Sequence, residues 1–398
     1  MNKKAIISVS FFLIVLIMLP YLIVFGQIVN QKNDDSFRND FSLLCKSNIA
    51  MLKKKVRDGK TGKFDKLRFL YAESYSVRGL NVAYDITGKN EYLEICKEWS
   101  DQQIKYQEKM QPEGAYYMGY ARSPGSDKGD WYTADCSSVA LAILATASRC
   151  EDILVKQKYI NSVKSFAKLV LDNYVGSAGG ITDGIWDYDG EWWCSSGIFG
   201  SVLFQLYKAT GDKKYFEAGL AVIDWLNLMK MEKIKYFGMD EYAPAVIMYT
   251  YEAYTTALPY LKVGSERRQK AISKIGEAVN WMLINLYGNG NNTGKGSWYE
   301  RYWGQKMGGF PFHIYTWARY IPEYQFLIPI ADKEMKYLKK LTIKDGEPFY
   351  IDADHLSIDA KTIEELNEKY SKATSKPQIA IFLMMSYAEK LSPGAIYK

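Results

Sequence analysis

Carboxylates, tryptophans and a cysteine meet at two similar places in this sequence. The first is GDWYTADCSS over residues 129–138, and the second is DYDGEWWCSS over residues 187–196. An apolar segment follows each of them, and its pattern predicts a buried helix. Carboxyl groups can transfer protons, and indole rings offer flat apolar faces to a ligand, so such a junction can support general acid/base chemistry. A simpler interpretation is that Asp and Ser cap the helix that follows.

Asp135 is the leading candidate for a general acid/base. Trp131, Tyr132 and the apolar helix that follows should desolvate its carboxyl group and raise its pKa. An acid catalyst that works near neutral pH needs such a raised pKa. Its alternative role is that of a helix N-cap.

A second acidic group, formed by Asp187, Asp189 and Glu191, lies in the other junction. Paired carboxylates about 5 Å or about 6.5–9.5 Å apart are what glycoside hydrolysis requires. We therefore predict Asp189 and Glu191 as catalytic partners of Asp135. The same three side chains would also suit a solvated loop or a calcium site.

Other aromatic and charged residues suit contact with a sugar ring or its carboxylate. The aromatic candidates, which offer stacking faces, are Trp131, Tyr132, Trp186, Trp192 and Trp193. The charged candidates, each with a purely structural alternative, are Arg78, Asp240, Glu241, Glu300, Arg301 and His313. Arg301 would clamp a carboxylate through two parallel hydrogen bonds, or pair with Glu300 inside the protein. His313, two residues before Tyr315, would serve a lyase as its base.

Composition excludes some classes of function. A net charge of +6, from 51 basic and 45 acidic residues without a basic block, does not favour nucleic-acid binding. The five cysteines form no Cys-x-x-Cys pair and there are two histidines, so we expect neither a metal site nor another cofactor. The high aromatic content, with 32 Tyr and 10 Trp, fits stacking on sugars and equally fits a large core.

The N-terminus has the features of a membrane segment. Lys3 and Lys4 precede a stretch without charge from Ala5 to Phe25, which is long enough for a helix to cross a bilayer core of about 30 Å. The lysines should remain cytoplasmic and direct the rest of the chain outward. We expect residues 1–30 to be an uncleaved signal anchor, with a cleaved signal peptide as the alternative, and residues 31–398 to form one extracytoplasmic domain.

The remaining sequence reads as a series of helical hairpins. The predicted first helices are apolar all round and cover about 67–86, 135–148, 194–209, 242–260, 311–321 and 377–390. The predicted second helices carry one charged face and cover about 91–110, 154–173, 214–231, 266–287 and 331–341, with 38–56 completing the set. The first kind suits an inner ring and the second an outer wall. We therefore predict an all-α fold, an (α/α)6 barrel of six helical hairpins.

Loop lengths predict which end of the barrel binds a ligand. The turns from inner to outer helices are short, whereas four returns are long, over about 111–134, 174–193, 288–310 and 342–376. Loops of this length are usually functional. They should gather where the positive N-terminal ends of the inner helices lie, which favours an anionic ligand.

At this point the sequence resembles a known family. The pattern Leu-Tyr-x-x-Thr-Gly-Asp-x-x-Tyr over residues 206–215, with an acid at an inner-helix start, is similar to the six-hairpin glycosidases. The nearest members are the unsaturated glucuronyl and rhamnogalacturonyl hydrolases. The resemblance implies that Asp135 protonates the C4–C5 double bond of an unsaturated uronic acid, to which water then adds. Where the family often has an acid one hairpin later, this sequence has Trp193.

The sequence therefore predicts a glycoside hydrolase acting on oligosaccharides that contain uronic acids. A polysaccharide lyase on the same toroid is the first alternative. A non-catalytic protein that binds or assembles glycans at the cell envelope is the second, because Trp193 replaces an acid. The sequence does not specify the glycan or the linkage.

Overall fold

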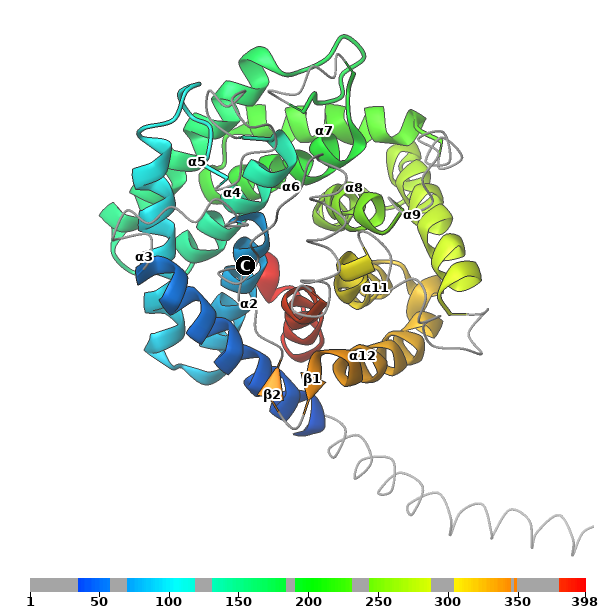
Figure 1. Cartoon of the computed structure of the whole chain (residues 1–398). Coiled ribbons are helices and arrows are strands. Elements are labelled where there is room, and N and C mark those ends of the chain that lie inside the picture. The colour runs from blue at the N-terminus through cyan, green and yellow to red at the C-terminus, as the bar shows by residue number, and fades with distance from the viewer. Residues whose placement is uncertain are drawn as a thin grey trace, which may run out of the picture.

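The computed structural model describes residues 35–57, 70–118, 131–183, 190–230, 243–287, 304–344, 347–348 and 379–398. The described chain forms two concentric rings of helices, seen along the barrel axis in Figure 1. The predicted all-α (α/α)6 architecture is confirmed. Short 3-10 helices and one small hairpin complete it. These are η4 (Gly304–Gly309), η5 (Pro322–Leu327), η7 (Ala395–Tyr397), and β1 (Ile343–Lys344) paired antiparallel with β2 (Glu347–Pro348).

The inner ring consists of helices buried on nearly every side. They are α2 (Leu70–Thr87), α4 (Thr133–Ala147), α6 (Trp193–Thr210), α8 (Ala243–Ala257), α11 (Phe310–Tyr320) and a helix over residues 379–391. In α4 all fifteen residues are buried. Small side chains let these helices approach closely: a Cβ on Gly197 of α6 would lie 2.2 Å from the Cα of Thr250 in α8.

The outer ring consists of amphipathic helices that bury one face. They are a helix over residues 35–57, α3 (Asn90–Gln107), α5 (Ile153–Asn173), α7 (Lys213–Leu228), α9 (Glu266–Asn285) and α12 (Ile328–Thr342). In α5 the buried residues recur at three- and four-residue spacing, from Tyr159 and Ile160 to Val170. Proline at position 329 lies in the first turn of α12, where a missing amide proton costs nothing.

Short turns join each inner helix to the next outer one. Gly88 and Gly211, each preceded by a threonine at a helix end, have φ of 67° and 72°. Glycine has no Cβ and adopts this left-handed conformation without strain, so both residues can end the helices that precede them. Asp152 and Asp212 then cap α5 and α7 by accepting backbone amide protons. All inner helices therefore run in one direction and begin at the end of the barrel that carries the long loops.

The first and last helices close the ring. The hydroxyl of Tyr387 donates to Asp40 at 3.2 Å, and Asp40 also pairs with Lys339 of α12. The ring of Phe37 lies 5.7 Å from that of Tyr387. The chain thus joins residues 347 positions apart in a continuous toroid.

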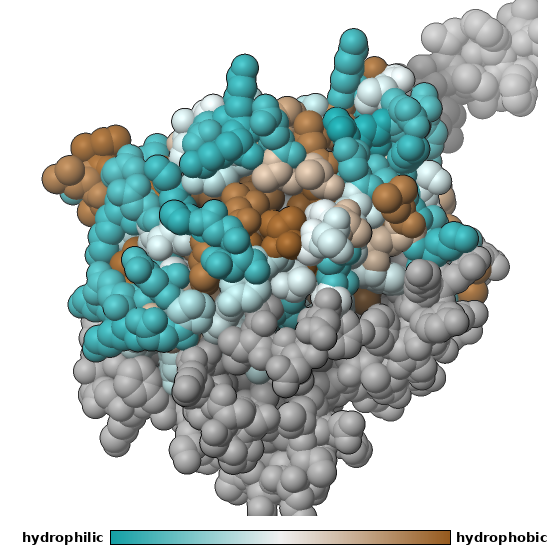
Figure 2. Space-filling view, turned by 90° about the horizontal axis from the view of Figure 1, so that it is seen from above, coloured by the Kyte–Doolittle hydropathy of each residue, from teal (hydrophilic) through white to brown (hydrophobic). Residues whose placement is uncertain are grey.

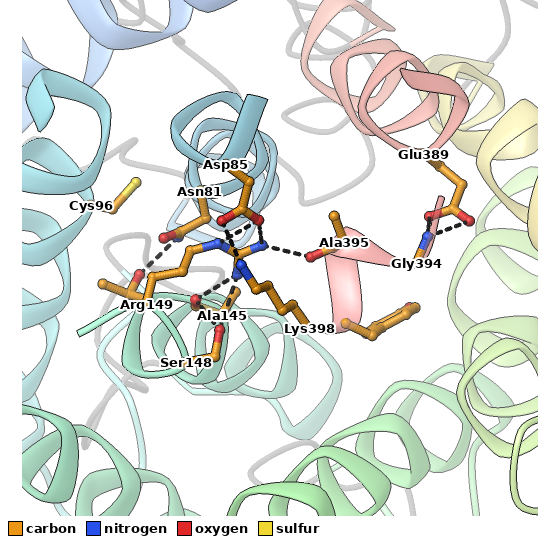
Figure 3. Close-up of polar contacts among 12 residues, drawn as sticks. Asn81, Asp85, Cys96, Ala145, Ser148, Arg149, Glu389, Gly394, Ala395 and Lys398 are labelled. Atoms are coloured by element: carbon orange, nitrogen blue, oxygen red, sulfur yellow. Dashed lines mark hydrogen bonds and ion pairs between the residues drawn. The ribbon is translucent and has the colours of Figure 1, made fainter. Parts of the chain in front are cut away.

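The C-terminal segment closes the short-turn end of the barrel. Figure 3 shows Arg149, which follows α4, between Asp85 of α2 and the backbone oxygen of Ala395, at 2.5 and 2.7 Å. Gly394 donates its amide proton to both oxygens of Glu389. Lys398 reaches Asp85 at 3.1 Å. These contacts hold residues 394–398 across the ends of α2, α4 and the helix over residues 379–391, so the ring is covered at this end.

Within the described residues no helix is both long enough and apolar enough to span a bilayer. Residues 1–34 lie outside the described part, so the expected N-terminal anchor and the domain boundary at residue 30 stay predictions.

Candidate active site

Asp135 lies in the first turn of the inner helix α4, at the long-loop end of the barrel. It is the third residue of the helix, and its side chain is 9% exposed. The N-cap position belongs to Tyr132, which makes no side-chain capping bond. The interpretation of Asp135 as an N-cap is therefore wrong. Its carboxylate lies near the positive end of α4, which stabilises a negative charge.

A second buried carboxylate, Asp183, lies between the starts of two inner helices. Its Oδ1 accepts from the hydroxyl of Ser195 in α6 at 2.7 Å, and its backbone oxygen accepts from the amide of Thr133 at 3.3 Å. The side chain is 2% exposed. Sequence reasoning missed this residue, although an acid in the Thr182-Asp183 pair just before the second acidic group was a signal.

The negative charges of Asp135 and Asp183 both affect the pKa values of two buried thiols, those of Cys136 and Cys194. Burial raises the pKa of Cys136 and of Cys194, and the charges of both carboxylates raise these pKa values further. The ammonium of Lys306, which precedes α11, opposes this effect at Cys194. Electrostatic influence of this kind falls off steeply with distance, so the three charged groups lie around one region at the head of α4 and α6.

Tyrosines surround this region. Burial, above all, raises the pKa of Tyr75 and Tyr249 well above the usual value, and Asp135 contributes to both. The two rings lie 6.4 Å apart, and the Lys306 ammonium lies 4.2 Å from the ring centre of Tyr71 and 5.3 Å from that of Tyr249. Neutral phenols beside a carboxylate can donate hydrogen bonds to an oxygen-rich ligand.

The carboxylate of Glu191 accepts three hydrogen bonds from the protein. Its Oε1 accepts from the amides of Ala178 and Gly180, at 2.7 and 3.2 Å, and its Oε2 accepts from the indole of Trp225 at 2.9 Å. Oε1 holds the turn after α5, where a Cβ on Gly176 would collide with the Glu191 side chain, and Oε2 ties Glu191 to α7. These bonds favour a turn-stabilising role over the predicted role of second catalytic acid.

The predicted aromatic platforms differ in their surroundings. Trp131 is fully buried and packs edge-on against Tyr174 with ring centres 5.0 Å apart, and Tyr132 is 5% exposed. Neither has a free face for a sugar. Trp192 is partly exposed, and Trp193 lines a small pocket with residues of α7, α8 and α9. Among the described candidates Trp192 keeps a partly exposed side chain, whereas Trp193 is 9% exposed.

His313 has no exposed surface for a substrate. Its ring nitrogens lie 2.9 Å from the Thr255 hydroxyl and 3.0 Å from the backbone oxygen of Met248. Burial lowers its pKa to about 3, so the ring is neutral. Tyr315 donates to Asp332 at 2.6 Å on the outer wall. These contacts do not support the predicted use of His313 in substrate binding or as the base of a lyase.

Arg78 lies inside the ring, as its position in the first inner helix predicted. Its guanidinium is 1% exposed and pairs with the fully buried Glu252 of α8. The hydroxyl of Tyr397 donates to the same Glu252 oxygen at 2.5 Å. This buried cluster joins the C-terminal segment to the interior.

The remaining predicted site residues lie outside the described part of the chain. They are Trp186, Asp187, Asp189, Asp240, Glu241, Glu300 and Arg301. Among the described residues no group of three or more His, Cys, Asp or Glu side chains is placed to hold a metal ion. All five cysteines are buried free thiols.

Solved structures share this fold. Two are glycoside hydrolases, one of family 105 from C. acetobutylicum and one described as a possible member of that family from Salmonella enterica. The first is 15% identical with a TM-score of 0.55, covering 88% of this chain and 99% of its own. The second is 13% identical with a TM-score of 0.55, covering 87% and 94%. A polysaccharide lyase is 13% identical with a TM-score of 0.52, covering 87% and 97%.

The fold is that of the six-hairpin glycosidases. The resemblance seen in the sequence is confirmed at this level. No protein-family model and no curated protein matches the sequence. Identities of 13–15% show a shared fold alone, so the activity has to be argued from the site.

Proposed function

We propose that this protein is a carbohydrate-active enzyme, a glycoside hydrolase that acts on uronic-acid-containing oligosaccharides by general acid/base catalysis. The observation that carries the proposal is the pair of buried carboxylates, Asp135 in the first turn of α4 and Asp183 between the starts of α4 and α6. Tyr75 and Tyr249 lie within electrostatic range of Asp135, and the ammonium of Lys306 lies over the rings of Tyr71 and Tyr249. The likeness in fold to two glycoside hydrolases supports the same class of substrate.

Each group has a role in this proposal. Asp135 donates the proton, because its carboxyl group is largely buried at the end of the barrel where the long loops begin. Asp183 holds the start of α6 through Ser195 and keeps a second negative charge beside Asp135. The like charge and the burial favour a protonated carboxyl group, the state that an acid catalyst needs, against the positive end of α4, which favours the carboxylate. Trp192, which is partly exposed, supplies an apolar contact to the sugar.

A direct assay separates this function from its alternatives. Unsaturated uronyl oligosaccharides absorb ultraviolet light through the C4–C5 double bond, and intact polyuronates do not. The hydrolase should consume the absorbance of the first substrate, whereas a lyase should create absorbance from the second. The likeness to a polysaccharide lyase makes the second arm necessary. Binding of oligosaccharides without turnover in either arm would favour the non-catalytic glycan-binding protein.

We also propose that residues 1–30 anchor the protein in a membrane with the barrel on the extracytoplasmic side. The uncharged stretch from Ala5 to Phe25 after Lys3 and Lys4 supports this. Protease added to intact cells or spheroplasts should then digest the barrel. Complete protection of the barrel would contradict the proposed orientation.

A further inference from the structure

An ion pair crosses the interior of the inner ring. Hydrophilic side chains cover much of the outer surface seen in Figure 2, where water solvates them. Inside the ring, Arg78 of α2 pairs with Glu252 of α8, and the two side chains are 1% and 0% exposed. Folded proteins pair nearly all of their buried polar groups, because a group left unpaired loses its bonds to water without replacement. Every polar atom of this pair therefore needs a partner.

One nitrogen of Arg78 and one oxygen of Glu252 are left over by the ion pair. The pair joins Nη2 to Oε1, and the hydroxyl of Tyr397 donates to the same Oε1 at 2.5 Å. Nη1 and Oε2 are buried, and neither has a hydrogen-bond partner in the part of the chain that the structure describes. A guanidinium nitrogen is a donor and a carboxylate oxygen is an acceptor. A molecule that serves both atoms must therefore accept one hydrogen bond and donate another.

Two tyrosine hydroxyls continue this row of unpaired atoms toward Asp135. Tyr75 lies one turn before Arg78 on α2, and Tyr249 lies one turn before Glu252 on α8. The two rings lie 6.4 Å apart, and the Arg78 guanidinium lies 5.2 Å from the ring centre of Tyr75. Both tyrosines are at most 5% exposed, and among the described residues neither hydroxyl has a partner in hydrogen-bonding geometry. The row thus spans two successive turns of two facing helices.

The charges that act on Tyr75 show that these groups lie close together. Burial raises the pKa of its phenol most, the charge of Glu252 raises it further, and Arg78 opposes the rise. Ser138 of α4 also lowers this pKa, without lying in hydrogen-bonding geometry with the hydroxyl. Asp135 contributes to the raised pKa as well. Because such effects fall off with distance, the ion pair, the phenol and Asp135 form one polar column inside the ring.

The balance of charge selects what can occupy this column. Arg78 and Glu252 neutralise each other, so an ion placed between them would be attracted by one partner and repelled by the other. A small neutral molecule that both donates and accepts hydrogen bonds suits the place. Water has these properties, and a buried water typically makes about three hydrogen bonds to groups that the protein leaves unpaired.

We propose that the interior of the barrel, between Asp135 and Tyr397, binds ordered water through Nη1 of Arg78, Oε2 of Glu252 and the hydroxyls of Tyr75 and Tyr249. This water joins the ion pair to the phenols beside Asp135 in one hydrogen-bonded network. The ring of Tyr397, 5.3 Å from the Arg78 guanidinium, covers the column on the short-turn side. Exchange with the solvent should therefore be slow. The proposal concerns the interior of the fold and does not depend on the reaction at Asp135.

Oxygen-17 magnetic relaxation dispersion of the full chain detects water molecules that stay bound far longer than surface water. The test variant combines Tyr75→Phe with Tyr249→Phe, which removes both hydroxyls and keeps both rings. The matched control is Tyr116→Phe, because the hydroxyl of the fully buried Tyr116 already has a protein partner, the Ser162 hydroxyl at 2.8 Å.

The double variant should lose the dispersion amplitude of at least one long-lived water, whereas the control should keep the amplitude of the wild type. An unchanged amplitude in the double variant, or an equal loss in the control, would overturn the proposal. Circular dichroism of both variants checks that each retains the helical fold.

A crystal structure of the unmodified chain tests the ion pair itself and depends on no variant. Electron density for water should lie within hydrogen-bonding distance of both Nη1 of Arg78 and Oε2 of Glu252. A direct bond between these two atoms would make the pair bidentate and satisfy both without water. That arrangement, or an interior without density for water, would contradict the proposal.

Discussion

Asp135 combines two features that suit a general acid. Its carboxylate is largely buried in the first turn of an inner helix, and a second buried carboxylate, Asp183, precedes the neighbouring helix α6 and accepts a hydrogen bond from Ser195 at its start. Asp135→Asn keeps the size and most hydrogen-bonding capacity of the side chain but removes its proton. Activity should fall about 10²–10⁴-fold, the usual contribution of a general acid, with little change in melting temperature.

The control for this variant is Glu191→Gln. Glu191 holds a turn through two backbone amides and the Trp225 indole, so its loss should lower the melting temperature more than the rate of the chemical step. If Asp135→Asn kept full turnover on a substrate that the wild-type enzyme cleaves, Asp135 would not be the acid and Asp183 would become the next candidate.

The raised pKa of the buried Glu334 predicts that the free energy of unfolding depends on pH. Burial on the inner side of α12 raises its pKa to about 8, and neither carboxylate oxygen has a hydrogen-bond partner in the part of the chain that the structure describes. The folded protein keeps the proton that the unfolded chain releases above the ordinary pKa of 4.5. The free energy of unfolding should therefore fall as pH rises from about 5 to 8.

Glu334→Gln removes this titration. Relative to the wild type, the variant should gain roughly 2–4 kcal/mol in the free energy of unfolding between pH 5 and pH 9, measured by urea denaturation. The same change at the exposed Glu323 should leave the pH dependence unaltered. A Glu334→Gln gain that is equal at both pH values would show that Glu334 does not titrate in this range.

At the scale of the helices, the Arg78–Glu252 pair connects α2 with α8 and with the C-terminal segment. Both side chains are buried, and the Arg78 guanidinium also lies 5.2 and 5.3 Å from the ring centres of Tyr75 and Tyr397. Glu252→Gln leaves the guanidinium without a compensating charge. Removing one partner of a buried pair costs about 3–5 kcal/mol, so urea unfolding should show a loss of that size.

The matched control lies on an exposed surface. Glu94 pairs with Lys97 on α3, with side chains 59% and 31% exposed. Glu94→Gln should cost less than about 1 kcal/mol. Similar losses for the two variants would mean that burial does not strengthen the dependence of Arg78 on its partner.

The helices were predictable because the spacing of apolar and charged residues along each segment indicates which of its faces are buried. The stretch from Val139 to Ala147 has no polar face except Thr146, and it forms the buried helix α4. The stretch from Lys156 to Lys168 alternates charged and apolar positions, and it forms the outer wall. Local periodicity is enough to assign such segments to the inner or the outer ring, because an inner helix is buried on nearly every side and an outer helix buries one face.

The site was predictable only in part, because it depends on contacts between distant segments. The place of Asp135 at an inner-helix start follows from the sequence around it. Asp183 accepts hydrogen bonds from Thr133 and Ser195, and no local sequence pattern predicts that these residues lie close together. In the sequence Glu191 resembles a catalytic acid. In the structure its carboxylate accepts hydrogen bonds from backbone amides of a turn whose shape depends on Gly176 and Gly180.

At the scale of the whole molecule, the barrel depends on closure between its first and last helices. Asp40 joins the helix over residues 35–57 to Tyr387 and Lys339, and Phe37 packs on Tyr387. A chain starting near Asp35 should therefore give a helical circular dichroism spectrum and melt in one cooperative transition. Two separable transitions, or a strong strand signal, would contradict a single closed domain.

Removing the closing helix tests the same idea more sharply. A chain starting after residue 57 loses the partners of Tyr387 and exposes the inner helix over residues 379–391, whose residues are otherwise buried from Ile379 to Glu389. In an open helical array, such a loss would destabilise only the neighbouring hairpin, because each repeat contacts only its neighbours. In a closed toroid, removing one helix opens the ring and so removes a constraint on every helix pair. The melting transition of the whole domain should therefore shift or vanish together, and a truncated chain that retained the full transition would show that closure is not required.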